Sequence, residues 1–247
     1  MMDKASSTTE DYRASHLEKG RHYDAALAES PFDAYMSTWE RRHLPAILRR
    51  LYPSGPARYL DFACGTGRIT EQVAASAHEA VGVDISPTMI EQARRKCPKV
   101  SFHLADLTTQ DLELGQFDLV TSFRFFGNAQ DELRDNALRA ITRHMAAGAH
   151  LVINSHRNPR ALFARLARLT GGDTSELDLD LPKLRALLAR HGLRIVGLQP
   201  IGAWMYRSSL MVNVPPDDPR AVRNEARFGK ALFAPIAPDC IVVSRKD

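Results

Sequence analysis

A glycine-rich turn between a predicted strand and a predicted helix carries the residues best suited to chemistry. The stretch from Arg58 to Thr70 reads R-Y-L-D-F-A-C-G-T-G-R-I-T, and its apolar run at 59–62 is typical of a buried strand. Gly65 and Gly67 follow, and both can adopt the positive φ angles that let a ligand approach the backbone closely. A strand, a tight glycine turn and a helix together indicate a cradle for a nucleotide-like ligand.

A second predicted strand ends in a carboxylate that suits the same ligand. Residues 79–85, E-A-V-G-V-D-I, read as a buried strand, and Asp84 lies 17 residues after Gly67. A carboxylate at this place in an α/β sheet can accept hydrogen bonds from both hydroxyls of a ribose. Asp84 therefore favours a nucleoside ligand, without distinguishing a dinucleotide from other nucleosides.

The glycine turn departs from the dinucleotide pattern G-x-G-x-x-G, because Thr70 stands where the third glycine would be. Asp61 lies four residues before Gly65, which gives the form D-x-x-x-G-x-G. This form resembles motif I of the class I S-adenosylmethionine-dependent methyltransferases, and V-G-V-D-I-S-P-T-M-I resembles their second motif. The resemblance covers roughly residues 57–155. It implies S-adenosylmethionine as cofactor and in-line methyl transfer to an oxygen or nitrogen of a small molecule.

The resemblance implies a Rossmann-like α/β fold with a seven-stranded, mostly parallel sheet, an antiparallel last strand and helices on both faces. The predicted strands are 58–62, 79–85, 100–107, 116–124, 150–155, 193–199 and 240–244. The predicted helices are 68–77, 87–95, 131–145, 158–170, 181–191 and 218–232, with Gly148 as the stop signal after the third.

The regions outside this core divide the chain further. Residues 1–15 are polar and are predicted to be disordered. Residues 16–51 have helical periodicity with a break at Ser30-Pro31, and we interpret them as an N-terminal helical cap. Residues 52–247 form the Rossmann-like domain, in which 200–238 are an insertion between the sixth and seventh strands. The insertion is a candidate for a substrate wall or for a subunit contact, as in a homodimer.

The resemblance also implies the residues that contact the cofactor. Asp106 would accept a hydrogen bond from the adenine amino group, and the backbone near Phe123 would bind the amino group of the methionine part. Tyr23 begins a Tyr-Asp pair that resembles an element lying near the cofactor in that family. The complete set of predicted cofactor residues is Tyr23, Asp61, Ala63, Cys64, Gly65, Gly67, Asp84, Ile85, Met89, Ala105, Asp106, Leu107 and Phe123.

The predicted acceptor site follows the fourth strand, in the run Phe-Arg-Phe-Phe at 123–126. Phe125 and Phe126, with Trp39 of the cap, would form an apolar wall. Arg124 would either hold a substrate carboxylate or phosphate or form a salt bridge on the surface. If a general base is needed, the candidates are four histidines, of which His156 is the first choice because it follows the fifth strand. The four are His22, His43, His144 and His156.

Composition limits the classes of function. The formal net charge is +4, but the basic residues form only scattered groups of two or three, which disfavours nucleic acid as a partner. The sequence has no apolar run of 18 residues, so no membrane span is predicted. The start of the chain does not resemble a signal peptide, and three cysteines fit a reducing cytoplasm. The nine histidines show no metal-ligand spacing, so no metal is predicted.

Other functions share part of this pattern. An NAD-dependent dehydrogenase would share Gly65, Gly67 and Asp84, but the chain lacks the third glycine and a Tyr-x-x-x-Lys pair. A DNA amino-methyltransferase would carry N-P-P-Y or D-P-P-Y after the fourth strand, where this chain has Ser122 and the Phe-Arg-Phe-Phe run. An RNA or protein methyltransferase and a non-catalytic S-adenosylmethionine-binding protein remain as alternatives.

Overall fold

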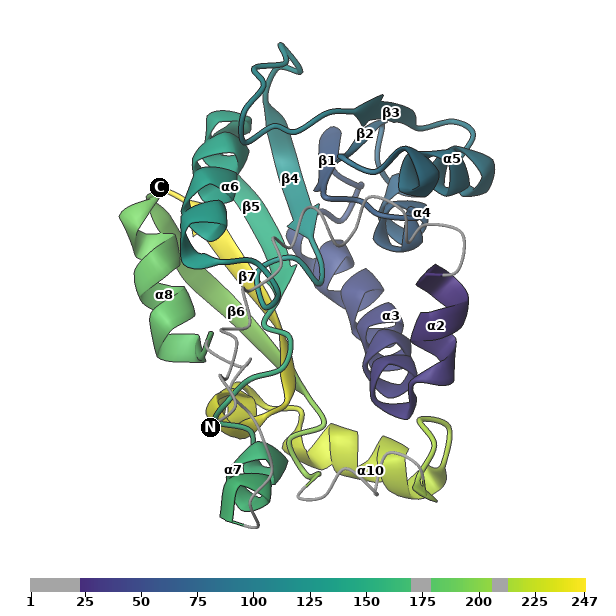
Figure 1. Ribbon diagram of the computed structural model, residues 1–247, viewed down its shortest axis with the longest axis vertical. Coiled ribbons are helices and arrows are strands. Elements are labelled where there is room, and N and C mark those ends of the chain that lie inside the picture. The colour runs from purple at the N-terminus through teal and green to yellow at the C-terminus, as the bar shows by residue number, and fades with distance from the viewer. Residues whose placement is uncertain (1–22, 170–178, 206–212) are drawn as a thin grey trace, which may run out of the picture.

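The computed structural model describes residues 23–169, 179–205 and 213–247, so the predicted disorder of 1–15 lies outside the described residues. The described strands form one seven-stranded sheet in the order β3-β2-β1-β4-β5-β7-β6 (Figure 1). Their bounds are β1 Arg58–Phe62, β2 Glu79–Asp84, β3 Ser101–Leu104, β4 Phe117–Ser122, β5 Met145–Asn154, β6 Leu193–Ile201 and β7 Asp239–Lys246. The predicted Rossmann-like sheet is confirmed.

The directions of the strands bring the ends of several strands to one edge. The pairs β1–β2, β1–β4, β2–β3 and β4–β5 are parallel, and only β7 runs antiparallel to its neighbours β5 and β6 among the described strands. Residues after β1, β2, β4 and β5 therefore meet at the carboxyl edge of the sheet, where ligands bind in open α/β sheets.

Helices cover both faces of the sheet, as predicted. They are α2 Tyr23–Glu29, α3 Pro31–Leu51, α4 Arg68–Ala74, α5 Pro87–Lys96, α6 Asp131–Arg143, α7 Leu162–Leu169, α8 Leu181–Arg190 and α10 Pro219–Phe228, with a 3₁₀ helix η2 at Ala231–Ile236. Apolar side chains of α6 and α8 pack with Leu60 and Val242 on one face. Those of α3 and α4 pack with Tyr59 and Val243 on the other. Side chains alternate across a strand, so neighbouring residues reach opposite faces.

Helix α3 links the carboxyl edge of the sheet to its opposite edge. It begins after Ser30, whose side chain accepts a hydrogen bond from the backbone N–H of Asp33 at 3.3 Å. Its C-terminal half buries Leu44 and Leu48 against the sheet. The following Tyr52 donates to the carbonyl oxygen of Asp118 in β4. The predicted break at Ser30-Pro31 is confirmed, and no helix in the described ranges is long and apolar enough to cross a membrane.

Several predicted helix boundaries were wrong: α4 ends at Ala74 rather than at 77, and α7 begins at Leu162 rather than at 158. Helix α6 stops at Arg143, and Gly148 lies inside β5 with a φ of 76°. The carbonyl oxygen of His144 already accepts from the backbone N–H of Phe117, so pairing with β4 draws the chain into a strand before Gly148. Helix α10 ends at Phe228, where the N–H of Gly229 bonds to Glu225, and the separate helix η2 follows.

Candidate active site

A pocket opens at the carboxyl edge, beside the ends of β1, β2 and β4. It has a volume of about 940 Å³ counted to its open mouth. Twelve of the thirteen predicted cofactor residues line it: Tyr23, Asp61, Ala63, Cys64, Gly65, Asp84, Ile85, Met89, Ala105, Asp106, Leu107 and Phe123. The predicted acceptor residues Arg124 and Phe125 line the same pocket. The chain therefore brings the two predicted sites together.

The glycine turn has the backbone conformation that its sequence predicts. Gly65 has a φ of 55° and Gly67 a φ of 80°, both in the left-handed region. A Cβ at Gly67 would lie 3.2 Å from Ala93 of α5, so this glycine allows helix packing and does not face the pocket. Ala63 is also left-handed, with a φ of 55°, which is uncommon for a residue with a side chain. This turn shapes one wall of the pocket from backbone.

Asp61 is held beneath the turn by hydroxyl groups. Its side chain accepts from the hydroxyl of Thr70 at 2.6 Å and from that of Thr121 at 2.7 Å. Only 1% of Asp61 is exposed. Burial raises the pKa of Asp61 to about 6, because the hydrogen bonds only partly offset the loss of solvent around the charge. Thr70, the residue in place of the third glycine, thus anchors α4 to the end of β1.

Asp84 is oriented toward the pocket by backbone groups. One carboxylate oxygen accepts from the N–H of Gly65 at 2.8 Å, and the other accepts from the N–H of Ser86 at 2.9 Å. Burial raises the pKa of Asp84, against the lowering effect of these bonds. Each carboxylate oxygen can accept more than one hydrogen bond, so Asp84 retains capacity for hydroxyl donors from a ligand. This acceptor fits the hydroxyl groups of a ribose.

The far end of the pocket combines an acid with apolar side chains. Asp106 folds back on Thr108, accepting from its N–H at 2.9 Å and from its hydroxyl at 2.5 Å. Ile85, Met89 and Leu107 supply apolar walls. A flat aromatic base with polar edges would match such a surface. The Cys64 thiol, also on the lining, has its pKa raised by burial and reads as a packed side chain.

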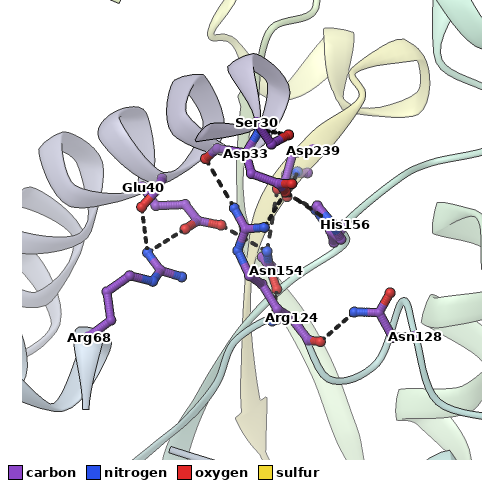
Figure 2. Close-up of polar contacts among 11 residues, drawn as sticks. Ser30, Asp33, Glu40, Arg68, Arg124, Asn128, Asn154, His156 and Asp239 are labelled. Atoms are coloured by element: carbon purple, nitrogen blue, oxygen red, sulfur yellow. Dashed lines mark hydrogen bonds and ion pairs between the residues drawn. The ribbon is translucent and has the colours of Figure 1, made fainter. Parts of the chain in front are cut away.

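Arg124 has a role that the sequence alternatives did not include. It is 6% exposed and forms an ion pair with Asp33 of α3, so it is neither a surface salt bridge nor an uncompensated charge (Figure 2). Burial acts to lower the pKa of Arg124, but the charges of Glu40 and Asp33 outweigh burial and raise it. Its φ is 61°, and its backbone N–H donates to Asn154 at 2.6 Å. Arg124 thus joins the end of β4 to α3 and to the end of β5.

His156 is placed behind the pocket lining. It is 3% exposed, and its Nδ1 lies 3.3 Å from Asp239 while its ring packs near Phe32 (Figure 2). Burial, with the nearby Arg124, lowers the pKa of His156 to about 3. This geometry does not support its predicted role as a general base. Of the other candidates, His43 and His144 also lie outside the pocket lining, and His22 lies outside the described residues.

Three other predicted residues are also absent from the pocket lining. Phe126 is fully buried in the core beside α6, and Trp39 is 6% exposed and stacks on His43. Gly67 faces α5, as described above. None of the described residues of the insertion 200–238 lines the pocket. Instead, Glu225 of α10 accepts from the hydroxyl of Tyr35 in α3 at 2.8 Å, so the insertion contacts the cap.

Sequence reasoning missed two residues that build the cationic side of the site. Arg68 lines the pocket and forms a 2.8 Å ion pair with Glu40, which is fully buried. The signal for Glu40 was its spacing, because Met36, Glu40 and Leu44 lie on one stripe of α3 and both apolar neighbours are buried. A lone acid on an apolar stripe indicates a buried charge with a partner.

Comparisons with known proteins identify the family of the chain. A family model described as "Methyltransferase domain" matches residues 60–148. Trans-aconitate 2-methyltransferase of Methylobacterium nodulans is 30% identical over 190 residues, which are 73% of this chain and 68% of that protein. The chain belongs to the S-adenosylmethionine-dependent methyltransferases. As a methyltransferase it uses S-adenosylmethionine as cofactor, and the dehydrogenase interpretation is set aside.

Two further comparisons are with a longer relative and with a solved structure of low sequence identity. The dTDP-4-amino-2,3,4,6-tetradeoxy-D-glucose N,N-dimethyltransferase of Saccharopolyspora spinosa is 31% identical over 146 residues, and the chain covers 51% of it, or about half. The crystal structure of magnesium protoporphyrin IX methyltransferase from Synechocystis PCC 6803 with bound SAH has a TM-score of 0.65 at 12% identity. That alignment covers 95% of this chain and 98% of that one, which shows a shared fold.

Proposed function

We propose that this methyltransferase acts on a small-molecule acceptor, at oxygen or nitrogen, bound at the mouth of the pocket. The observation that carries the proposal is the continuous lining, in which predicted cofactor residues adjoin Phe125, Leu133 and Arg124. This lining would hold both the cofactor and the reacting part of the acceptor. Named relatives that act on aconitate, a sugar amine and a porphyrin support an acceptor of this class.

The proposed cofactor contacts combine the family resemblance with the place of the predicted residues on the pocket lining. When bound, S-adenosylmethionine supplies a methyl group already activated on a sulfonium. Asp84 would accept from the ribose hydroxyls, Asp106 would bind the adenine edge, and Ile85 and Met89 would pack on its faces. The turn at Gly65 would lie against the methionine part.

The N-terminal helices would complete the site as a cap. We propose that the described part of the predicted 16–51 cap, residues 23–51, covers the pocket of the 52–247 domain, since Tyr23 lines the pocket and α3 holds Arg124 through Asp33. Catalysis would depend on holding the acceptor atom in line with the methyl group, which can raise the reaction rate by several orders of magnitude.

A cytoplasmic location is also proposed, supported by the three free cysteines.

The test is a transfer assay that separates acceptors by size. The protein is incubated with S-adenosylmethionine labelled in its methyl group and with pooled metabolite acids and amines, total RNA or total protein. We expect label in the acid-soluble small-molecule fraction. Label in acid-precipitated RNA or protein would contradict the proposal and favour a macromolecular acceptor. Absence of transfer to every pool, with cofactor binding intact, would favour a non-catalytic binding protein.

A further inference from the structure

A buried cluster of charged side chains lies between α3 and the carboxyl edge of the sheet, next to the pocket (Figure 2). Glu40 of α3 is fully buried within it. One carboxylate oxygen of Glu40 binds Nη1 of Arg68 at 2.8 Å, and the other accepts from Nδ2 of Asn154 at 2.8 Å. The two oxygens of one cap residue thus bind two separate parts of the sheet domain.

Both partners of Glu40 lead directly to the pocket wall. Arg68 is the first residue of α4, immediately after the glycine turn, and its side chain lines the pocket. Asn154 ends β5, and its Oδ1 accepts from the backbone N–H of Arg124 at 2.6 Å. The φ of Arg124 is 61°, a backbone conformation that is unfavourable for a residue with a side chain unless surrounding contacts stabilise it.

The cap supplies further contacts to the same two arginines. Ser37 accepts from Nη1 of Arg68 at 3.1 Å, and Asp33 pairs with Arg124. Asp33, Ser37 and Glu40 lie on one helix, so α3 fixes both pocket-lining arginines at once. Figure 2 shows Asp33 and Glu40 beside these arginines. A fully buried carboxylate such as that of Glu40 is unfavourable unless it is paired. Because Glu40 pairs with Arg68, undocking of α3 would leave Arg68 without its buried counter-charge.

We propose that Glu40 is a positioning residue that makes cofactor affinity depend on the docking of α3. By holding Arg68, and by holding the turn at Arg124 through Asn154, it sets the cationic wall of the pocket from outside the pocket lining. The inference rests on the proposed placement of the cofactor in this pocket, and the experiment below separates the two claims.

The experiment measures binding of S-adenosylhomocysteine by calorimetry, with the melting temperature of each variant. In Glu40→Gln the side-chain NH₂ would face either Arg68 or Asn154, so one of the two bonds is lost. We expect binding to weaken about tenfold, as for coupled neighbouring residues. The matched control is Glu29→Gln, the same change at an exposed position of α2, with unchanged affinity.

Two further variants test whether Glu40 acts through Arg68. In an Arg68→Met background, adding Glu40→Gln should change affinity less than about twofold, because the bond to Arg68 is already absent and the amide oxygen can still accept from Asn154. Ser37→Ala removes the weaker bond to Arg68 and should reduce affinity about threefold. This milder variant keeps the test valid if Glu40→Gln does not fold.

The outcomes separate the alternatives. A lower melting temperature with wild-type affinity would show that Glu40 is merely structural and would overturn the inference. The inference would also be overturned if the loss of affinity in the double variant equalled the product of the losses in Glu40→Gln and Arg68→Met. Asp84→Asn reports on the cofactor placement itself: unchanged binding in that variant would overturn both claims, whereas lost binding there with no effect at Glu40 would overturn only the inference.

Discussion

At the scale of single residues, the site contains one buried acid, Asp61, whose hydrogen-bond donors are neutral groups. These donors are the hydroxyls of Thr70 and Thr121. Hydroxyl donors stabilise a carboxylate less than a cationic partner does, so burial dominates its pKa. The same hydroxyls can also accept a hydrogen bond, so the protonated acid remains satisfied.

This chemistry predicts that stability falls as the pH rises from about 4 to about 6. In that window the unfolded chain loses the proton of Asp61, while the folded protein keeps it because its pKa is about 6. The native state then binds more protons, so the free energy of unfolding decreases with pH, by about 2–3 kcal/mol from this group. Urea unfolding at a series of pH values measures the effect.

Asp61→Asn should flatten this pH dependence, because the amide has no proton to release and can satisfy both threonines. Asp111→Asn is the control, since the Asp111 side chain is 73% exposed and should leave the slope unchanged. An Asp61→Asn protein with the full wild-type slope would show that another group carries the effect.

Residues of the site differed in how well the sequence predicted them. Most of the predicted cofactor residues lie on the pocket lining, because many of them belong to short motifs at the ends of β1 and β2, where local spacing reports position. Arg124 and Asp33 are separated by 91 residues, and such a contact forms only when α3 docks. His156 was placed correctly after β5 but proved to face Asp239, because strand order does not specify which way a loop side chain turns.

At the scale of elements, α3 holds two arginines of the pocket lining. It contributes Asp33, Ser37 and Glu40 to the charged cluster, and Leu44 and Leu48 to the core. Its start is fixed by the hydrogen bond from the N–H of Asp33 to the side chain of Ser30. The periodicity of α3 was readable from sequence, but the place of Glu40 between Met36 and Leu44 on the apolar stripe was a signal that the sequence analysis did not use.

Ser30→Ala should therefore reduce the free energy of unfolding by about 1 kcal/mol, as loss of an N-cap does. Ser30→Thr retains the capping oxygen and should lose much less. Chemical denaturation of both variants measures the difference. Equal destabilisation by the two changes would show that the hydroxyl does not cap α3.

At the scale of the whole molecule, the order of the strands explains why one pocket collects residues from distant segments. β1, β2 and β4 end at the same edge, and each delivers a site residue there: the glycine turn, Asp84 and Phe123. This arrangement was predictable, because the alternation of strands and helices specifies the parallel sheet. The position of the insertion against the cap was not, since it depends on a contact between Glu225 and Tyr35.

The central claim is that this pocket binds the methyl-donor cofactor through Asp84. Calorimetry with S-adenosylhomocysteine and, separately, NADH on the wild type and on Asp84→Asn tests it most directly. We expect binding of S-adenosylhomocysteine but not of NADH, and a loss of affinity of about 10–100-fold in Asp84→Asn with the protein still folded. Undiminished binding in the folded variant, or binding of NADH alone, would contradict the account.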